Sequence, residues 1–255
     1  MALFTDGTIS TIEELLGSES SILEVARTEK IDLTTKLSLA GQEIGIELSV
    51  FLAQQSGADF PGGAWTKPEL KNVVVTEPLR KWHTHYTLAL VYRDAYNSQL
   101  NDRHLGKWRA YEQLAKRASA ALFEIGMGMV SEPIVQAEKP ALSSVPGALP
   151  AATYFARVSW LDGTGEEGNA SEPGALSVPE GSLLVAAAVG PPENAQAWNV
   201  YVGPASDDVT LQNDTPIPLG QLWTEASSGL KAGRKPGSGQ APEWYLRAGR
   251  SLQRG

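Results

Sequence analysis

Residues 79–100, LRKWHTHYTLALVYRDAYNSQL, place apolar side chains at intervals of three and four, which is the period of an α-helix. Such a wide apolar stripe indicates a helix at the centre of a helical unit. Thr76, Glu77 and Pro78 precede it, and proline is tolerated in a first helical turn, so we expect the helix to begin there. The main stripe consists of Leu79, Trp82, Tyr86, Ala89, Leu90 and Tyr96, and it is widened by Leu88, Val91, Tyr92 and Ala95.

Helices are also predicted on both sides of this stretch. Residues 32–55 carry one apolar stripe behind Asp32, a good helix cap, and residues 105–126 carry another behind a short turn at Asn101–Asp102. So short a connection predicts that the last two helices are antiparallel neighbours. Two short helices should come first, because Ser10-x-x-Glu13 and Ser21-x-x-Glu24 have the spacing of a capping box.

The period changes in the second half of the chain. Residues 153–161, TYFARVSWL, alternate, with Tyr154, Ala156, Val158 and Trp160 on one face. Short strands at regular intervals with turn residues between them indicate an antiparallel sandwich. The further strands are expected at residues 175–178, 182–189, 198–202, 209–212 and 219–224. The fold class is therefore α+β in separate domains, an α-helical bundle followed by an antiparallel β-sandwich.

Charge divides the 255-residue chain at similar places. Residues 1–145 hold 14 basic and 18 acidic side chains, residues 146–230 hold 1 and 10, and residues 231–255 hold 6 and 1. Stretches with such different balances predict separate structural units. The expected units are a helical body (1–138), a linker with three prolines (139–150), a sandwich (151–230) and a basic C-terminal tail (231–255).

Several kinds of chemistry are disfavoured. The chain has no cysteine, which excludes thiol nucleophiles and disulfides, and no P-loop, GxSxG or HExxH motif. It has neither an apolar stretch of about 18 residues nor a visible secretory signal. His83 and His85 would face away from each other on a helix, and the oxygen-rich loop Asp162–Glu167 lacks a calcium-loop pattern. Adjacent acidic pairs such as Glu166–Glu167 indicate solvated charge. We expect no catalytic residue, metal or cofactor.

Part of the sandwich sequence resembles a known kind of module. The aromatic strand 153–161, the loop ending in Ser171-Glu172-Pro173, the Pro191-Pro192 step and the strand Trp198–Val202 occur in an order similar to that of fibronectin type III-like modules on tailed-phage virion proteins. The resemblance covers residues 146–226. It implies a virion protein without saying which part of the particle.

Residues 1–130 resemble the head-to-tail adaptor (connector) proteins of long-tailed phages. The resemblance is carried by the capped start, the helix IDLTTKLSLAGQEIGIEL and the stretch LRKWHTHYTLALVYRDAYNSQLNDRHLGKWRAYEQLAKRA. It implies a structural protein of the virion neck, made in the host cytoplasm, whose copies form a ring, usually of twelve. The implied partners are other copies of the chain, the portal protein and a downstream head-closure or tail-terminator protein. DNA would pass through the ring without specific binding, and no membrane is involved. The minimal family lacks the appended sandwich.

The tail contains aromatic and arginine residues, which are favoured anchors of protein interfaces. We predict that it orders on a partner, and the resemblance implies that this partner is the portal. Two alternatives are that the tail folds back onto its own subunit or stays disordered, and direct DNA contact is a third possibility. The predicted binding residues are Trp244, Tyr245, Leu246, Arg247 and Arg250.

Two other function classes remain open. The chain could be a binding module of a tail or surface protein whose sandwich recognises host carbohydrate or a receptor. It could also be a polysaccharide-degrading enzyme with an accessory module. An exposed aromatic cluster on the sandwich would favour the binding module, and closed rings would favour the adaptor.

Overall fold

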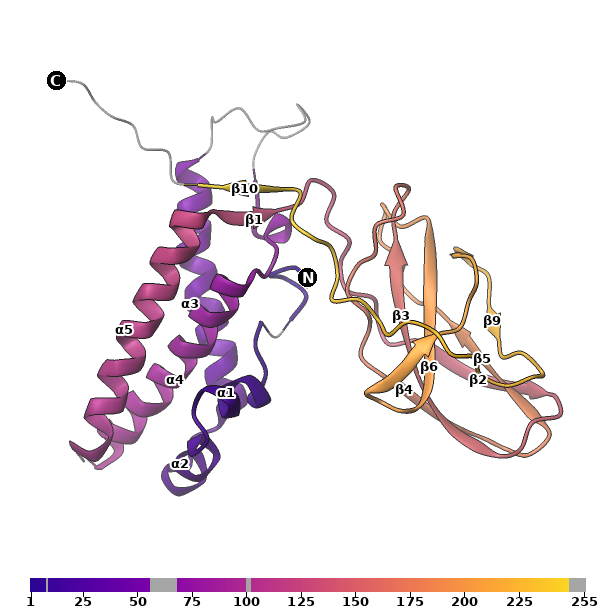
Figure 1. Cartoon of the computed structure of the whole chain (residues 1–255), viewed down its shortest axis with the longest axis horizontal. Coiled ribbons are helices and arrows are strands. Elements are labelled where there is room, and N and C mark those ends of the chain that lie inside the picture. Colours follow the sequence, from indigo (N-terminus) through magenta and orange to yellow (C-terminus); the bar gives the residue numbers. More distant parts are fainter. Residues whose placement is uncertain (8, 56–67, 100–101, 248–255) are drawn as a thin grey trace. The chain divides into compact units, whose positions relative to one another are not determined.

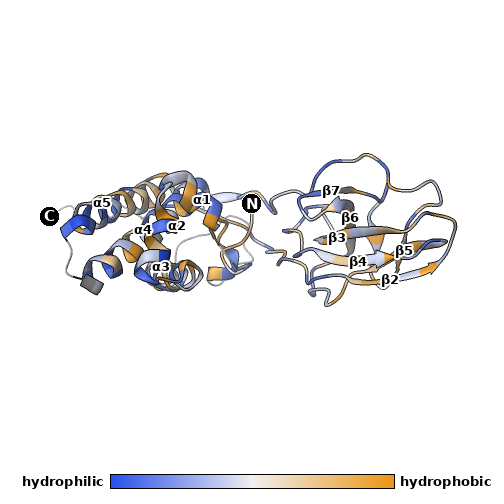
Figure 2. Ribbon diagram, turned by 90° about the horizontal axis from the view of Figure 1, so that it is seen from below, coloured by the Kyte–Doolittle hydropathy of each residue, from blue (hydrophilic) through white to orange (hydrophobic). Residues whose placement is uncertain are grey.

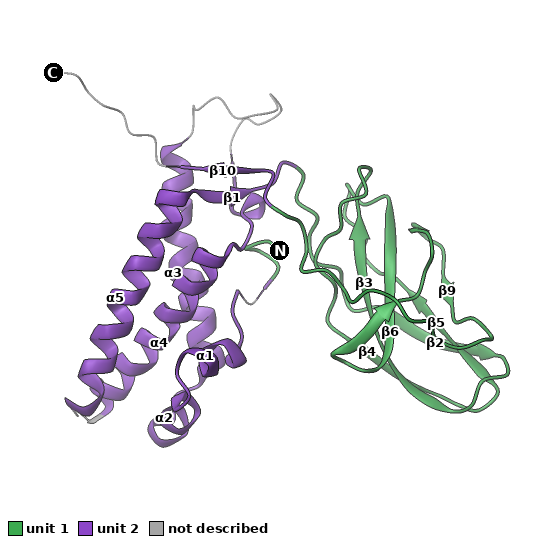
Figure 3. Cartoon of the chain, viewed as in Figure 1, with its two compact units in different colours: residues 1–6, 132–241 green, residues 7–131, 242–255 purple. Residues whose placement is uncertain are grey.

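The computed structural model describes residues 1–7, 9–55, 68–99 and 102–247. The chain forms two compact units (Figure 3), one helical and one built of β-sheets. The helical unit contains residues 7–131 and the chain from residue 242 onward, and the β unit contains residues 1–6 and 132–241. Each unit therefore includes one end of the chain, an arrangement that the charge and proline pattern did not predict.

The helical unit is built around three long helices, which Figure 1 shows together with its shorter elements. Its elements are α1 (Ile12–Ser18), α2 (Ile22–Glu29), α3 (Leu33–Gln54), the 3-10 helix η1 (Leu70–Asn72), α4 (Glu77–Gln99), α5 (Asp102–Ile125), β1 (Met127–Met129) and β10 (Trp244–Leu246). α4 packs against both α3 and α5. It is therefore the central helix, as its wide apolar stripe predicts.

The helix starts follow local capping rules, with two corrections. The first capping box is Thr11 with Glu14 rather than Ser10 with Glu13, because Ser10 is buried and its hydroxyl bonds His83. Ser21 precedes α2 but bonds Glu19 instead of capping the helix. Asp32 caps α3 as predicted, accepting a hydrogen bond of 2.9 Å from the Thr34 backbone N–H.

Aromatic contacts show that α4 and α5 are antiparallel. Ring centroids lie 6.1 Å apart for Trp82 and Phe123, 5.7 Å apart for Tyr92 and Tyr111, and 5.8 Å apart for Tyr96 and Trp108. The partner on α5 moves toward its start as the residue on α4 moves toward its end, which confirms the predicted orientation. The two helices lie side by side in Figure 1.

The β unit is a sandwich of two antiparallel sheets. Its strands are β2 (Ala141–Pro146), β3 (Ala152–Leu161), β4 (Gly174–Val178), β5 (Ser182–Ala187), β6 (Ala197–Ala205), β7 (Asp208–Leu211), β8 (Ile217–Pro218) and β9 (Trp223–Thr224). One sheet has the order β2-β5-β9, and the other has the order β4-β3-β6-β7 with β8 added to β6. The predicted fold class, a helical region followed by separate antiparallel β-sheets, is confirmed.

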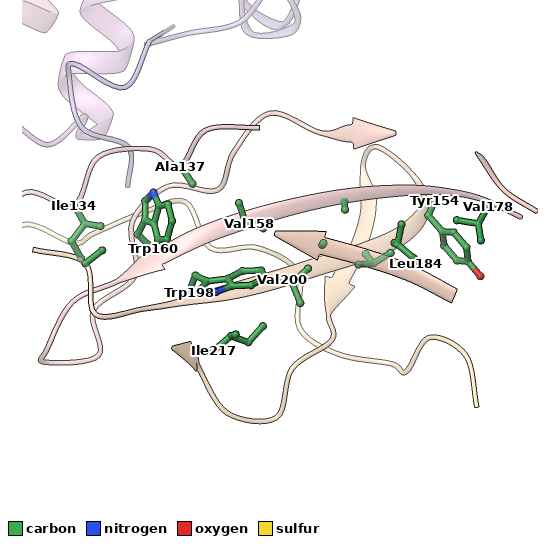
Figure 4. Close-up of a cluster of buried hydrophobic side chains, with 14 residues drawn as sticks. Ile134, Ala137, Tyr154, Val158, Trp160, Val178, Leu184, Trp198, Val200 and Ile217 are labelled. Atoms are coloured by element: carbon green, nitrogen blue, oxygen red, sulfur yellow. The ribbon is translucent and has the colours of Figure 1, made fainter. Parts of the chain in front are cut away.

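The two sheets share one apolar core (Figure 4). The predicted inner face of β3 is buried as expected, from Tyr154 to Trp160, and β5 contributes Leu184 and Ala186 from the opposite sheet. Figure 4 shows Trp160 and Ile134 near one end of this cluster, and Tyr154, Val178 and Leu184 near the other. Figure 2 shows hydrophobic and hydrophilic segments alternating along the helices and strands of both units.

The predicted linker at residues 139–150 is wrong for half of its length. Residues 141–146 form β2, paired along their whole length with β5. β2 is an edge strand and most of its side chains are exposed, so it lacks the apolar alternation that identifies a half-buried strand. Its closing residue Pro146 is compatible with an edge position.

Among the described residues, no helix combines the length and apolar character needed to cross a membrane.

Candidate functional site

The predicted binding residues of the tail lie on or next to β10, which pairs antiparallel with β1. Trp244 lies opposite Met129, Tyr245 opposite Gly128, and Leu246 opposite Met127. The other edge of β1 is also occupied, because the Val74 N–H donates to the Gly128 carbonyl at 2.9 Å. The C-terminal segment thus adds the outer strand to a small sheet beside the helices.

Side chains fasten this strand at both ends. Before it, Glu243 accepts hydrogen bonds from the backbone N–H and the hydroxyl of Ser131, at 3.0 and 2.5 Å. After it, Arg247 Nε donates to the Ile125 carbonyl at 2.8 Å. At Gly128, an added Cβ would lie 2.8 Å from both Pro242 Cγ and Thr76 Cγ2. The close approach of the tail therefore requires glycine at this position.

The tail described through residue 247 folds back onto its own chain, which is the first alternative considered above. Leu246 is buried and Trp244 is partly buried, so these two residues contribute to the fold of the helical unit. Tyr245 is 51% exposed, and Arg247 is exposed. Arg250 lies outside the described residues. Whether these residues bind a partner stays a prediction, and the available surface is that of Tyr245 and Arg247.

The basic residues at the start of the tail are bound to the acidic sandwich. Lys231 forms an ion pair with Asp214, Lys235 pairs with Asp208 at 3.4 Å, and the Arg234 carbonyl accepts from the Leu211 N–H at 2.9 Å. The opposite net charges of residues 146–230 and of the tail are thus partly neutralised within the chain. Residue counts predicted the charge imbalance, but not that the basic residues would pair with acidic residues of the same chain.

Glu167 is the centre of a polar cluster on the outer side of the β3–β6 pair. One carboxylate oxygen accepts hydrogen bonds from Tyr201 at 2.5 Å, from Asn199 at 3.2 Å and from Ser159. The other accepts from Arg234 at 2.6 Å. The prediction of solvated charge at Glu166–Glu167 is wrong for Glu167, whose side chain is only 16% exposed. Four converging donors offset the cost of removing the charge from water.

The ionisation of this cluster follows from its contacts. Burial alone would raise the pKa of Glu167, but the hydrogen bonds from Ser159, Tyr201, Arg234 and Asn199 outweigh burial and lower it. The pKa of Tyr201 is raised, first by burial and then by its bond to Glu167. At neutral pH Glu167 is therefore ionised and Tyr201 is neutral, and the hydrogen bond between them stabilises the fold.

The oxygen-rich loop beside it is also occupied by internal bonds. Asp162 Oδ1 accepts from the backbone N–H and the hydroxyl of Thr164, both at 2.8 Å, and from the Glu166 N–H at 2.9 Å. Glu166 in turn accepts from Gln240 Nε2 at 3.0 Å. The carboxylates of the acidic loop are thus engaged in hydrogen bonds within the β unit, which gives the loop a structural role in the sandwich. Across the described parts of the chain, no three His, Cys, Asp or Glu residues are grouped so as to hold a metal ion.

The two histidines of α4 face different helices, as helical geometry predicts, because His83 bonds α3 and the ring centroid of His85 lies 6.3 Å from that of Tyr111 on α5. His83 Nε2 lies 3.0 Å from the Leu37 carbonyl, and its Nδ1 lies 2.5 Å from Ser10 Oγ. A carbonyl can only accept, so Nε2 carries the proton and Nδ1 accepts from Ser10. Ser10 and His83 are both almost fully buried, which favours a structural hydrogen bond over a serine–histidine nucleophile. Burial lowers the pKa of His83 to about 4.

A polar depression lies where α2, α3 and α4 meet, lined by Lys30, Asp32, Lys36 and Asp94 among others. Most of its charged groups already have partners, because Lys36 pairs with Asp94, Glu29 lies 3.5 Å from His104 and Asp32 caps α3. It therefore offers little unpaired charge to a ligand.

Comparison of the sequence with protein-family models and with curated proteins gave no match.

Proposed function

We propose that this chain is a structural subunit of a phage neck, a head-to-tail adaptor that forms a ring between the portal and the next neck protein. The observation that carries the proposal is the architecture, a helical unit with a long antiparallel helix pair joined to a separate β-sandwich. This order of parts agrees with the two resemblances in the sequence. The ring would leave a passage for DNA.

The charge distribution supports this proposal. Residues 1–230 carry 15 basic and 28 acidic side chains, and a ring through which DNA slides should not grip phosphates. The three basic residues that follow, Lys231, Arg234 and Lys235, are engaged by acidic partners of the sandwich. A sequence-specific nucleic-acid binder would instead present a basic stripe to the phosphates.

In this proposal the tail meets the portal as a preformed strand. Tyr245 is exposed on β10, and Arg247 lies directly after it with an exposed side chain. Aromatic and arginine side chains held on a rigid element lose little entropy on binding. These two residues are therefore the proposed portal contacts on the described part of the tail.

The alternative, a sandwich that recognises host carbohydrate, has less support. Each aromatic side chain of residues 132–241 is buried or partly buried, including Trp160, Trp198 and Tyr201. An exposed aromatic cluster, the feature that would favour this alternative, does not occur on the sandwich.

The test is to purify the chain alone and with the portal of the phage that encodes it, and to determine mass by native mass spectrometry and shape by negative-stain imaging. Closed rings, alone or on the portal, are expected. Tyr245→Ser should weaken portal binding several-fold, whereas Leu222→Ser, at a 64% exposed site in the β unit, should leave it unchanged. A chain that remains monomeric in the presence of the portal would contradict the adaptor function.

A further inference from the structure

An apolar stripe on α3 lies exposed on the helical unit. Ile46 and Val50 are 66% and 53% exposed, and they stand one turn apart on the helix. Ala53 continues the stripe toward the end of α3 and is exposed too. The opposite side of the helix is buried, from Leu33 to Leu52. Adjacent exposed aliphatic side chains on one helix face indicate a surface that is covered in an assembly.

Negative charge flanks this stripe. Glu43 and Glu47 lie beside Ile46 and Val50, and no lysine or arginine occurs between residues 37 and 54. Glu43 accepts a hydrogen bond from Tyr86. Glu47 is exposed and forms no ion pair with any described residue. Partial desolvation of its carboxylate and the charge of the neighbouring Glu43 raise its pKa. A cation brought by a partner would relieve this repulsion.

The outer face of α5 has the complementary charge. Arg109, Gln113 and Lys116 recur at helical spacing with Arg117 beside them, and all four are exposed. Lys116 pairs with Glu112 on its own helix at 3.0 Å. Neither Arg109 nor Arg117 forms an ion pair with a described residue. The small side chain of Ala120, also exposed, would allow another helix to approach this face closely.

α3 and α5 contact each other through Phe51 and Phe123, whose ring centroids lie 4.8 Å apart. The two proposed surfaces are both exposed, so they do not cover each other within one subunit. His83 and Tyr86 of α4 bond residues of α3, whereas Trp82, Tyr92 and Tyr96 contact rings of α5. The free faces of α3 and α5 point away from their contacts with α4. Complementary patches at two separate places on one molecule produce a head-to-tail contact, which closes into a ring when the rotation allows it.

We propose that the α3 face (Ile46, Glu47, Val50 and Ala53) binds the α5 face (Arg109, Gln113, Lys116 and Arg117) of a second copy of this chain. The apolar stripe supplies the buried centre of the contact, and Glu47 meets an arginine at its rim. This inference rests on the proposed ring and names the surfaces through which neighbouring subunits touch.

Disulfide trapping tests the contact directly, because the chain has no cysteine of its own. Val50→Cys and Gln113→Cys are prepared as separate proteins, mixed and mildly oxidised. Covalent dimers should form in the mixture and not with either variant alone, and the double variant should give a ladder of covalent oligomers. The matched control pairs Val50→Cys with Glu180→Cys, an exposed site in the β unit, and should yield no dimer above background.

Charge exchange provides a second measurement. Glu47→Lys and Arg109→Glu should each weaken self-association at least several-fold, and the combined variant should recover part of the loss. Far-UV circular dichroism checks that each variant stays folded.

The outcomes separate this inference from the proposed function. Dimers of Val50→Cys alone would show that α3 pairs with α3 and would overturn the inference. Rings that form, alone or on the portal, without trapping between Val50→Cys and Gln113→Cys would also overturn it, while the adaptor function stands. If no ring forms even with the portal, the proposed function fails together with the inference.

Discussion

The helical unit and the sandwich bury their polar groups in different ways. Both units contain a hydrogen-bonded carboxylate with a basic partner, Glu19 beside Lys107 in the helical unit and Glu167 beside Arg234 in the sandwich. The helical unit also buries a neutral histidine, His83, bonded to Ser10, whereas residues 132–241 contain no histidine. Burial disfavours the protonated form of His83, whereas the hydrogen bonds to Glu167 favour its ionised form. The two units should therefore respond differently to mutation and to pH.

The units also differ in which end of the chain completes them. Residues 242–247 give the helical unit its outer strand. The first residues of the chain belong to the sandwich unit, where the Met1 amino group donates to the carbonyls of Gly239 and Gln240 at 2.6 and 2.8 Å. Local helix signals thus account for most of the first unit, and contacts between distant segments complete both.

The largest effect is expected in the sandwich core. Trp160 is 1% exposed and packs within the shared core of the two sheets. Trp160→Ala removes a large buried side chain and should lower the free energy of unfolding of the β unit by about 3–5 kcal/mol. Urea denaturation measures the loss, with Leu219→Ala at a 38% exposed site as control. A loss below about 1 kcal/mol would contradict the core assigned to Trp160.

Acid should destabilise the helical unit first. The pKa of His83 falls from 6.5 to about 4 on folding. Between pH 6.5 and pH 4, His83 is therefore protonated in the unfolded chain and neutral in the folded chain. The contribution of His83 to the free energy of unfolding is fully present above pH 6.5. It decreases by about 3 kcal/mol as the pH falls toward 4. Urea denaturation from pH 7.5 to 4 measures the slope.

His83→Gln is the control for this pH dependence. It should reduce the slope of the free energy of unfolding against pH, whatever it does to the stability at pH 7.5. His85 contributes a change of the same sign, because burial lowers its pKa as well. Glu167 has a lowered pKa, so its contribution is present above about pH 4.5 and is lost as the pH falls further. An unchanged slope in His83→Gln would show that the Ser10–His83 pair does not control the acid response.

The packing of β10 should depend on Gly128, the residue of β1 that lies opposite Tyr245. Gly128→Ala places a methyl group 2.8 Å from Pro242 and Thr76 and should destabilise the helical unit by about 1–3 kcal/mol. Gly17→Ala is the matched control, because an added Cβ there meets nothing within 4 Å. Hydrogen exchange at residues 242–247 reports whether β10 detaches. Equal protection in both variants would argue against the close packing of the tail.

The smallest effect is expected at the surface of the sandwich. Lys235 and Asp208 form an ion pair at 3.4 Å with both side chains more than half exposed. Lys235→Ala should change the free energy of unfolding by less than about 1 kcal/mol, and added salt should reduce the difference further. Chemical denaturation at low and high salt measures it. A larger loss would mean that Lys235 supports the Arg234–Glu167 pair.

Residue patterns predicted the elements that depend on near neighbours in the chain. The stripe of α4, the cap at Asp32 and the alternation of β3 each follow from side chains a few residues apart, because helix and strand periods are local properties. The fold class and the antiparallel helix pair were predicted on this basis.

Contacts between distant segments could not be predicted in this way. β1 has only three residues and its partner β10 lies more than 100 residues later, while β2 lacks any apolar alternation. Glu167 has the same local sequence signature as a solvated acid, and it becomes the partly buried centre of a polar cluster only when Tyr201 and Arg234 approach it. The partners of β1, β2 and Glu167 are set by long-range packing. Hydrogen bonding and desolvation depend on which groups meet in space rather than on their spacing along the chain.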